Sequence, residues 1–446
     1  MKRNNDFFRT VCNLAIPVAL QSMLQASFSI IDQIMIGQLG GVSVAAVGLA
    51  GKFSSIYSVL IAAIGTVAGI MISQYLGQQN KKEVHRSFYL NLAIGVGIAI
   101  LFTGVCIVFP EQIMGLYSKE RDTIVVAGEY LRIVAGTFLP MAAATLLSTM
   151  FRCMEKASLP LNASIIAAVA NTGLNYIFIF GKFGCPQMGA KGAAYATLIS
   201  QFLNVLIMLV LYIYHKSKVK ELEDTQVEFA KFNWKQYAQI LLPILICEFV
   251  WSLGENVYAA IYGHLGTEAC AAMTLINPIQ SLVIGALCGI SQAASVIVGK
   301  LLGNGEYDNA YTAAKKLILY GLCGSVFLSV LVFLFRPLYV NIYQVEENIK
   351  VLTQQILVAY ALIAPVKVLN MILGGGIIRS GGKTKYVMLV DMIGTWGFGV
   401  PLGLLAAFVF QLSIPYVYFI LSLEECVRLG ISFIIFKKKS WIQRLE

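Results

Sequence analysis

Several polar side chains in the first half of the chain interrupt stretches that are otherwise apolar. Asp32 follows Gln25 by seven residues, so both lie near one face of the same helix. Asn171 and Asn175 are one helical turn apart in a later apolar stretch. A carboxylate in apolar surroundings is costly and marks a functional site by default. We predict that these side chains form a polar patch that binds a coupling cation or a substrate. The alternative is a purely structural hydrogen-bond network between helices.

The second half carries ionisable side chains of both signs. Glu248 and Glu255 are seven residues apart and share a helix face, while Lys367 is the one basic residue deep in a later apolar stretch. A rise of about 1.5 Å per residue, counted from the outer helix ends, puts Lys367 and Glu248 at similar depths. We predict that Lys367 pairs with Glu248, which leaves Glu255 available to exchange a cation. A structural role for the pair is the alternative.

The amino-acid composition indicates the class of protein that carries these side chains. The chain has 446 residues, of which 58% are apolar and only 13% are charged. Soluble globular proteins have about 25% charged residues. This excludes a disordered chain, a coiled coil, a disulfide scaffold and an ordinary cytosolic enzyme. No hydrolase motif and no paired Cys/His cluster is present in the sequence, so we predict a membrane protein that is not an enzyme and needs no cofactor.

Twelve stretches are long and apolar enough to cross a bilayer, which takes about 20 residues. Backbone polar groups must be satisfied inside lipid, so we expect helices and not strands. The predicted fold class is therefore an all-α polytopic membrane protein. The predicted spans are 11–36, 44–75, 88–109, 124–149, 160–181, 189–214, 238–262, 269–299, 317–335, 351–377, 386–409 and 414–436.

Basic residues predict the orientation of these spans, because Lys and Arg accumulate on the cytosolic side. With the N-terminus inside, the inner segments hold 23 of the 33 Lys and Arg residues and the outer loops hold six. Both termini are therefore predicted to be cytosolic. Basic loops that face anionic lipid also account for the net charge of +10, so no nucleic-acid partner is expected.

The two halves of the chain are internally similar. Residues 17–77 align without a gap with residues 243–303, and each segment has an early proline and a Leu-Gly pair at the end of each helix. Six spans is an even number, so the halves enter from the same side and are parallel repeats, as in transporters that alternate access by rocking one bundle against the other. We predict an N-terminal six-helix lobe over 1–214, a cytosolic linker over 215–236 and a C-terminal six-helix lobe over 237–446.

The helix from Pro17 to Gly40 and four further segments resemble multidrug and toxic compound extrusion (MATE) transporters, and the segment 251–266 indicates their bacterial branches. The resemblance covers essentially the whole chain. It implies twelve helices in two six-helix lobes, and the export of organic cations in exchange for protons or sodium. The segments are NTGLNYIFIFG (171–181), MGAKGAAYATLISQ (188–201), WSLGENVYAAIYGHLG (251–266) and RSGGKT (379–384).

Position by position, the resemblance implies a coupling role in the N-terminal half. Asp32 matches the helix-1 aspartate that one branch uses for cation coupling, and Asn171 matches that branch's helix-5 asparagine. Asn175 stands where the same branch has an aspartate, which argues against a two-carboxylate proton mechanism in this lobe.

The C-terminal half departs further from the family pattern. The branch with a helix-7 glutamate carries it at the position of Trp251, and Glu255 lies one turn later. The helix-10 aspartate of that branch falls near Val368, beside Lys367. Sodium coordination of the same form is therefore not expected, and a Na⁺ ion near Asp32 or Glu255 is left open.

We therefore predict a secondary active antiporter that exports organic cations and drugs in exchange for H⁺ or Na⁺. Its expected partners are the bilayer and lipophilic organic cations, and it is expected to work as a monomer in the bacterial inner membrane. Two alternatives remain. A flippase of lipid-linked oligosaccharides, from the same superfamily, requires a basic cavity. A non-transporting membrane sensor or assembly protein would tolerate neutralisation of its acids without any effect on a flux.

Overall fold

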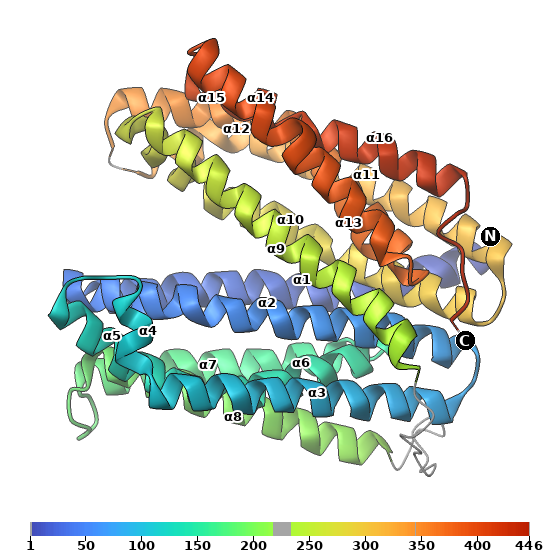
Figure 1. Ribbon diagram of the computed structural model, residues 1–446, viewed down its shortest axis with the longest axis horizontal. Helices are drawn as coiled ribbons and strands as arrows, with labels where there is room; N and C mark the ends of the chain where they lie inside the picture. Colours follow the sequence, from blue (N-terminus) through green and yellow to red (C-terminus); the bar gives the residue numbers. More distant parts are fainter. Residues whose placement is uncertain (1, 217–232, 344, 446) are drawn as a thin grey trace. The chain divides into compact units, whose positions relative to one another are not determined.

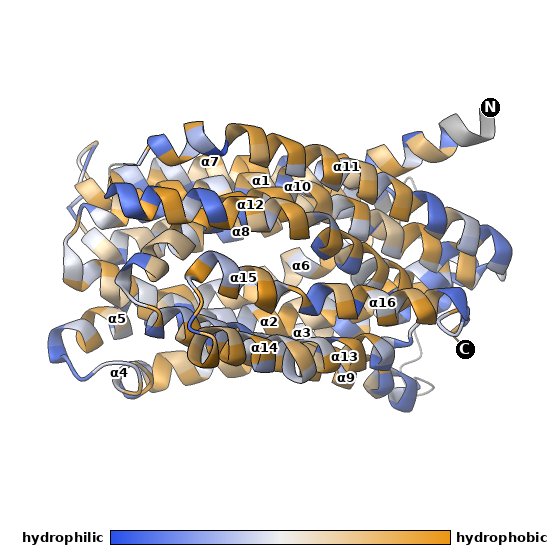
Figure 2. Ribbon diagram, turned by 90° about the horizontal axis from the view of Figure 1, so that it is seen from above, coloured by the Kyte–Doolittle hydropathy of each residue, from blue (hydrophilic) through white to orange (hydrophobic). Residues whose placement is uncertain are grey.

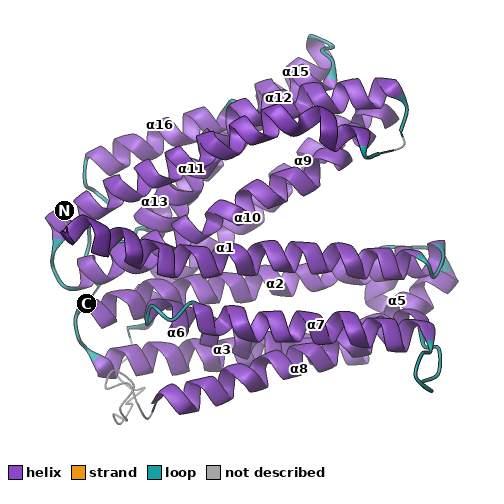
Figure 3. Cartoon of the chain, turned by 180° about the vertical axis from the view of Figure 1, so that it is seen from behind, coloured by secondary structure: helices purple, strands orange, loops and turns teal. Residues whose placement is uncertain are grey.

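The computed structural model describes residues 2–216, 233–343 and 345–445. These residues form helices and no strand (Figure 3). Within them, eleven helical segments are long and apolar enough to cross a membrane. The prediction of an all-α polytopic membrane fold is confirmed.

The helices of the first half end close to the predicted spans, but the first and the third begin nine and seven residues earlier than predicted. α5 and α6 are joined by one 3₁₀ turn and together form a single span. The elements are α1 (Lys2–Gly37), α2 (Gly41–Gly77), α3 (Lys81–Val108), α4 (Pro110–Gly115), α5 (Arg121–Val134), η1 (Ala135–Thr137), α6 (Phe138–Cys153), α7 (Ser158–Phe180) and α8 (Gly189–Lys216).

The helices of the second half include three π-helical segments, in which the backbone turn is wider than in an α-helix. The elements are α9 (Trp234–His264), α10 (Thr267–Gly303), α11 (Tyr307–Asn341), α12 (Glu347–Asn370), η4 (Met371–Ile378), α13 (Thr384–Met392), η5 (Ile393–Gly399), α14 (Val400–Leu404), η6 (Leu405–Val409), α15 (Ile414–Ser422) and α16 (Glu424–Lys437).

The last predicted span, 414–436, is divided at Leu423 into α15 and α16. The two pieces have 9 and 14 residues, so neither crosses a bilayer alone. α16 begins with Glu424 and Glu425 and carries Arg428 one turn later, and all three side chains are buried. This segment therefore brings charge into the interior of the protein.

Contacts divide the chain into two compact units. The C-terminal unit consists of Met1–Ala19, Ser73–Gln79 and Asn233–Glu446, and the N-terminal unit consists of Leu20–Ile72 and Asn80–Phe232. The start of α1 and the end of α2 thus group with the C-terminal unit, a division that differs from the predicted lobes. Most of the predicted linker, 217–232, lies outside the described residues.

The N-terminal unit is a helical bundle in which α3 packs against α6 and α7 packs against α8 (Figure 1). Its core includes Tyr57, which is fully buried. The Tyr57 hydroxyl donates to the carbonyl of Phe138 at 2.8 Å, and the two rings stack with centroids 4.4 Å apart. A buried tyrosine needs such a partner, because an unsatisfied hydroxyl is costly in an apolar interior.

The C-terminal unit is built around α10, which packs against α11, α12 and η4. The segment after α16 folds back onto this unit. Trp441 is fully buried, and its ring stacks on Phe436 with centroids 5.8 Å apart. The Gln74 amide donates to the Ser380 carbonyl at 2.7 Å, and its oxygen accepts from the Leu445 N–H at 2.7 Å. The end of the chain is thereby tied to the end of α2.

Apolar side chains cover the outside of the helices as well as the core. Figure 2 shows hydrophobic residues along most helices and hydrophilic residues mainly at helix ends and in loops. Phe327 is 63% exposed and Val210 is 59% exposed in mid-helix positions. Such surfaces are stable in contact with lipid, which fits helices that span a bilayer.

The backbone confirms the internal repeat independently of sequence identity. Residues with a left-handed φ, which the chain uses to leave a helix, recur at a constant shift of 226 or 227. Pro17 in α1 and Pro243 in α9 obey the same shift. The left-handed pairs are Gly40 and Gly266, Gln79 and Gly305, Glu155 and Gly382, and Gly184 and Gln411.

The Leu-Gly pairs of the repeat have a packing role within the C-terminal unit. A Cβ on Gly77 would lie 2.8 Å from the carbonyl carbon of Lys300, and a Cβ on Gly303 would lie 2.7 Å from that of Gln74. The shift of 226 relates Gly77 to Gly303 and Gln74 to Lys300, so the contact is pseudo-symmetric. Glycine at both positions lets the ends of α2 and α10 approach at backbone distance.

Candidate functional site

The predicted polar patch of the N-terminal unit is assembled in the structure. The Asn175 amide donates to the Asp32 carboxylate at 2.7 Å and to the Asn171 side-chain oxygen at 3.2 Å. Asn171 in turn donates to the Ser200 hydroxyl at 3.2 Å. Asn171 and Asn175 are buried, and Asp32 is half-buried. The arrangement holds one carboxylate oxygen in place on a row of amides and a hydroxyl.

The two glutamines of α1 behave differently from each other. The Gln21 amide donates to the Ser164 hydroxyl on α7 at 2.8 Å, which ties the two helices together. Gln25 is exposed and makes no hydrogen bond with any described residue. The structure therefore brings Asp32, Asn171 and Asn175 together and leaves Gln25 outside their network. The roles of all four in binding stay predictions.

The C-terminal unit contains a cavity of about 310 Å³ between its helices. This cavity, which we call the tyrosine cavity, has polar and charged walls contributed by five helices. Its defining residues are Glu255, Tyr262, Gln280, Lys367, Tyr418 and Glu424. The Gln280 amide donates to the Tyr418 hydroxyl at 2.9 Å, and the Lys367 ammonium lies 6.0 Å from the centre of the Tyr418 ring. Pockets of about 300 Å³ or more are large enough for small-molecule ligands.

The predicted pair of Lys367 with Glu248 is wrong. Glu248 instead forms an ion pair with Arg379, at 3.5 Å, and Lys367 shares the tyrosine cavity with Glu255. The prediction failed because it compared depths counted from the outer ends of two helices, and such depths are comparable only if the two ends lie at the same height in the membrane. Lys367 lies 20 residues from the start of α12 and Glu255 lies 9 residues from the end of α9, about 30 Å and 13 Å along the axes, yet both line one cavity.

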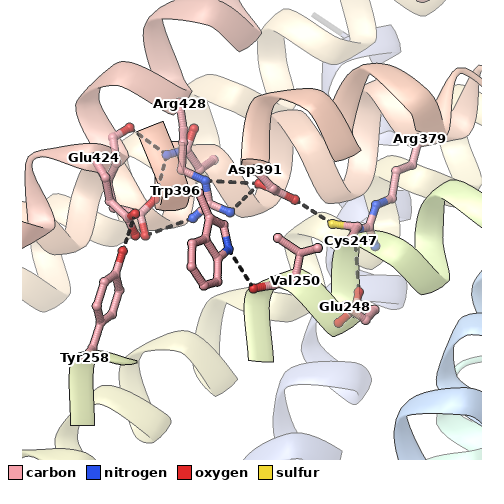
Figure 4. A network of polar contacts seen from close by, with 11 residues as sticks. Cys247, Glu248, Val250, Tyr258, Arg379, Asp391, Trp396, Glu424 and Arg428 are labelled. Carbon is pink, nitrogen blue, oxygen red and sulfur yellow. Dashed lines mark hydrogen bonds and ion pairs between the residues drawn. The ribbon is translucent and has the colours of Figure 1, made fainter. Parts of the chain in front are cut away.

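A network of charges runs beside the tyrosine cavity and includes residues that the sequence did not single out (Figure 4). The Tyr258 hydroxyl donates to Glu424 at 2.5 Å. The Arg428 guanidinium donates through Nε to Asp391 at 3.0 Å and through Nη1 to Glu425 at 3.4 Å. Two acids and an arginine within the last predicted span were the available signal for this network, because buried charges in a span need partners.

The same network continues toward Glu248. The Cys247 thiol donates to Asp391 at 2.7 Å, and Arg379 donates to the Cys247 sulfur at 3.5 Å (Figure 4). Arg379 also pairs with Glu248, so charged and polar groups connect Glu248 with the walls of the tyrosine cavity. Asp391 therefore accepts from Cys247 and also pairs with Arg428.

Among the described residues, no group of three or more His, Cys, Asp or Glu side chains is arranged to hold a metal ion. Amide, hydroxyl and single carboxylate oxygens also bind alkali cations, because hard cations prefer oxygen ligands. The Asp32 patch and the Glu255 side of the tyrosine cavity supply oxygens of these kinds.

Comparison with known proteins shows one consistent set of relatives. The MatE family model matches residues 17–177 and 243–405, once in each half of the chain. The Bacillus subtilis (strain 168) protein called "Uncharacterized transporter YisQ" is 22% identical over 445 residues, which cover 100% of this chain and 97% of that relative. The Thermotoga maritima "Probable multidrug resistance protein NorM" is 23% identical over 444 residues, which cover 98% of this chain and 93% of the relative.

A solved structure shares the fold. "Crystal structure of MATE in the straight conformation" superposes with a TM-score of 0.88 at 18% identity, over 96% of this chain and 95% of that chain. At this level of identity the superposition establishes the arrangement of helices alone.

Proposed function

Because the chain belongs to the MatE family of membrane transporters, we propose that it is a secondary active antiporter. In this proposal it exports organic cations and drugs by alternating access, and H⁺ or Na⁺ moves in the opposite direction. The whole-length similarity to a probable multidrug resistance protein supports the substrate class.

The carboxylate of Asp32 is the observation that carries the proposal. It lies in a helix that is apolar over most of its length, and the Asn175 amide holds one of its oxygens at 2.7 Å. A carboxylate in such a place binds a proton, a sodium ion or an organic cation, and binding of one reduces the affinity for the others. Competition for a single carboxylate that is reached alternately from two sides is sufficient for exchange.

The rest of the proposal concerns the protein's setting. Its partners are the lipid bilayer and lipophilic organic cations, and one chain acts as a monomer in a bacterial inner membrane. Both termini face the cytosol, because the predicted inner segments hold 23 of 33 basic residues. The coupling ion is the only cofactor that this mechanism uses.

The test is transport of a fluorescent organic cation by purified protein in proteoliposomes. Asp32→Asn keeps the size and hydrogen-bonding capacity of the side chain but removes its charge. The matched control is Glu129→Gln in the same unit, because Glu129 is an exposed carboxylate that pairs with Lys191 at 3.0 Å. We expect Asp32→Asn to abolish gradient-driven export and Glu129→Gln to leave it unchanged.

An unchanged rate in Asp32→Asn would remove the coupling role from Asp32. Equal losses in both variants would show that the transport assay responds to charge in general and would also contradict the proposal. The unfolding temperature of each variant separates loss of coupling from loss of folding.

A further inference from the structure

We propose that the tyrosine cavity binds a small zwitterion, such as an α-amino acid with an apolar or aromatic side chain. In this arrangement the ammonium of the ligand contacts Glu255 and its carboxylate contacts Lys367. The inference deepens the proposed function, on which it rests for the idea that the ligand is carried, whereas binding itself is measured without any flux.

Two opposite charges face the same cavity and form no direct ion pair with each other. Glu255 on α9 and Lys367 on α12 both line it. Within the described part of the chain, neither side chain makes a hydrogen bond or an ion pair with another residue. Glu255 is exposed and Lys367 is half-buried, so water compensates these charges until a ligand with complementary charges replaces it. The cavity therefore presents one negative and one positive pole to whatever occupies it.

The other acids near the cavity already have donors from the protein. Glu424 accepts the Tyr258 hydroxyl at 2.5 Å. Glu425 accepts the Asn370 amide at 2.8 Å and pairs with Arg428. Glu255 is consequently the carboxylate that is available to a ligand, and Lys367 is the available cation.

The charge pattern selects among ligand classes. A simple cation would be attracted by Glu255 and repelled by Lys367. An anion would be attracted by Lys367 and repelled by Glu255. Like-charge repulsion is strong at short distance in a medium of low dielectric constant. A ligand that carries both charges compensates both poles at once, so a zwitterion is the class that the cavity fits best.

The size and walls of the cavity narrow the class further. A volume of about 310 Å³ lies at the lower end of the range of ligand pockets, about 300–1,000 Å³, which suits an amino acid or a short peptide. Tyr262 and Tyr418 contribute ring surfaces beside the charged poles. Tyrosine presents an apolar face and a polar tip, so these walls accept an apolar or aromatic side chain.

The same chemistry occurs in a free amino acid and in the headgroup of phosphatidylethanolamine, which carries an ammonium and a phosphate. The experiment therefore separates the two sources. Binding of phenylalanine is measured by calorimetry in detergent and then in nanodiscs made with phosphatidylethanolamine or with phosphatidylglycerol. If phenylalanine binds more weakly in phosphatidylethanolamine nanodiscs than in phosphatidylglycerol nanodiscs, the phosphatidylethanolamine headgroup competes for the cavity, which supports the zwitterion site.

Three ligands with one side chain test the charge preference directly. They are phenylalanine as the zwitterion, phenylalanine methyl ester with its amine charged as the cation, and N-acetylphenylalanine as the anion. We expect the wild-type protein to bind phenylalanine at least about tenfold more tightly than either of the others, which corresponds to about 1.4 kcal/mol.

Variants of the two poles should change this order in opposite directions. Lys367→Met should make the methyl ester the best ligand, and Glu255→Gln should make N-acetylphenylalanine the best ligand. Lys367→Arg keeps the positive charge and should keep the preference for phenylalanine. The matched control is Lys350→Met on the same helix, because Lys350 pairs with Glu347 at 3.6 Å and does not line the cavity.

The proposal is overturned if the wild-type protein binds the methyl ester as tightly as phenylalanine, or if Lys367→Met leaves the order unchanged. If Lys367→Met does not fold, the proposal is still tested by the order of affinities of the wild-type protein and of Lys367→Arg for the three ligands. Failure of the transport proposal is recognised separately: gradient-driven cation export would be absent while phenylalanine binding and its response to the variants remained intact.

Discussion

Replacing Gly77 or Gly303 by alanine should push the ends of α2 and α10 apart. The added Cβ of Gly303→Ala would lie 2.7 Å from the carbonyl carbon and 2.9 Å from the Cα of Gln74. The corresponding distances for Gly77→Ala to Lys300 are 2.8 Å and 2.9 Å. In both cases the obstacle is backbone, which cannot move away as the end of a flexible side chain can.

The expected cost depends on these distances. Carbon atoms in good contact are about 3.5–4.0 Å apart, so the helix ends must separate by about 1 Å, and a gap of that size forfeits a quarter to a half of each neighbouring contact. Overpacking of this kind costs about 1–3 kcal/mol. Because one separation relieves both clashes, the double variant should cost less than the sum of the single variants, by about 0.5 kcal/mol or more.

The free energy of unfolding in mixed micelles, measured by titration with sodium dodecyl sulfate, checks these values. Gly430→Ala on α16 is the control, because its Cβ would meet nothing within 4 Å. That change should stabilise the protein by about 0.5–1 kcal/mol, since alanine is the better helix former. Single variants as stable as Gly430→Ala, or a strictly additive double variant, would refute the pseudo-symmetric packing of α2 on α10.

Two further predictions concern the C-terminal unit. Arg428→Met leaves the half-buried carboxylate of Asp391 and the buried carboxylate of Glu425 without their shared cation, so it should lower the free energy of unfolding by about 3–5 kcal/mol. Arg428→Lys should restore part of the loss. A double-variant cycle with Asp391→Asn measures the pair, and additive effects would contradict it. Trp441→Ala removes a fully buried ring and should cost about 3–5 kcal/mol, against little for Phe433→Ala, whose ring is 41% exposed. Equal unfolding temperatures for these two variants would show that the segment after α16 does not stabilise the unit.

Hydropathy was sufficient to predict the helices because a bilayer requires long apolar segments with internally satisfied backbones. The repeat was also visible in the sequence, although few of its residues are identical. Its signature was the position of Pro17, Gly77 and their partners, and the structure shows why such positions are constrained. A proline or a glycine at backbone contact is limited by geometry, whereas most lipid-facing side chains are interchangeable.

The partners of buried charges were harder to predict. Asp32 and Asn175 could be grouped from the sequence because both are polar side chains in apolar helices and each shares a helix face with other polar side chains, although they are 143 residues apart. The partner of Glu248 depends on the relative heights and rotations of the packed helices, and no period within a single helix contains that information. The pairing of Glu248 with Arg379 therefore required the three-dimensional structure.

The most direct test of the antiport proposal is gradient-driven movement of a fluorescent organic cation in wild-type proteoliposomes, with a pH gradient and a sodium gradient imposed separately. We expect one of these gradients to drive the cation against its own concentration gradient, with a matching flow of H⁺ or Na⁺ in the opposite direction. If neither gradient moves the cation, the antiport proposal is contradicted in its substrate class, and lipid-linked or anionic substrates become the next to test.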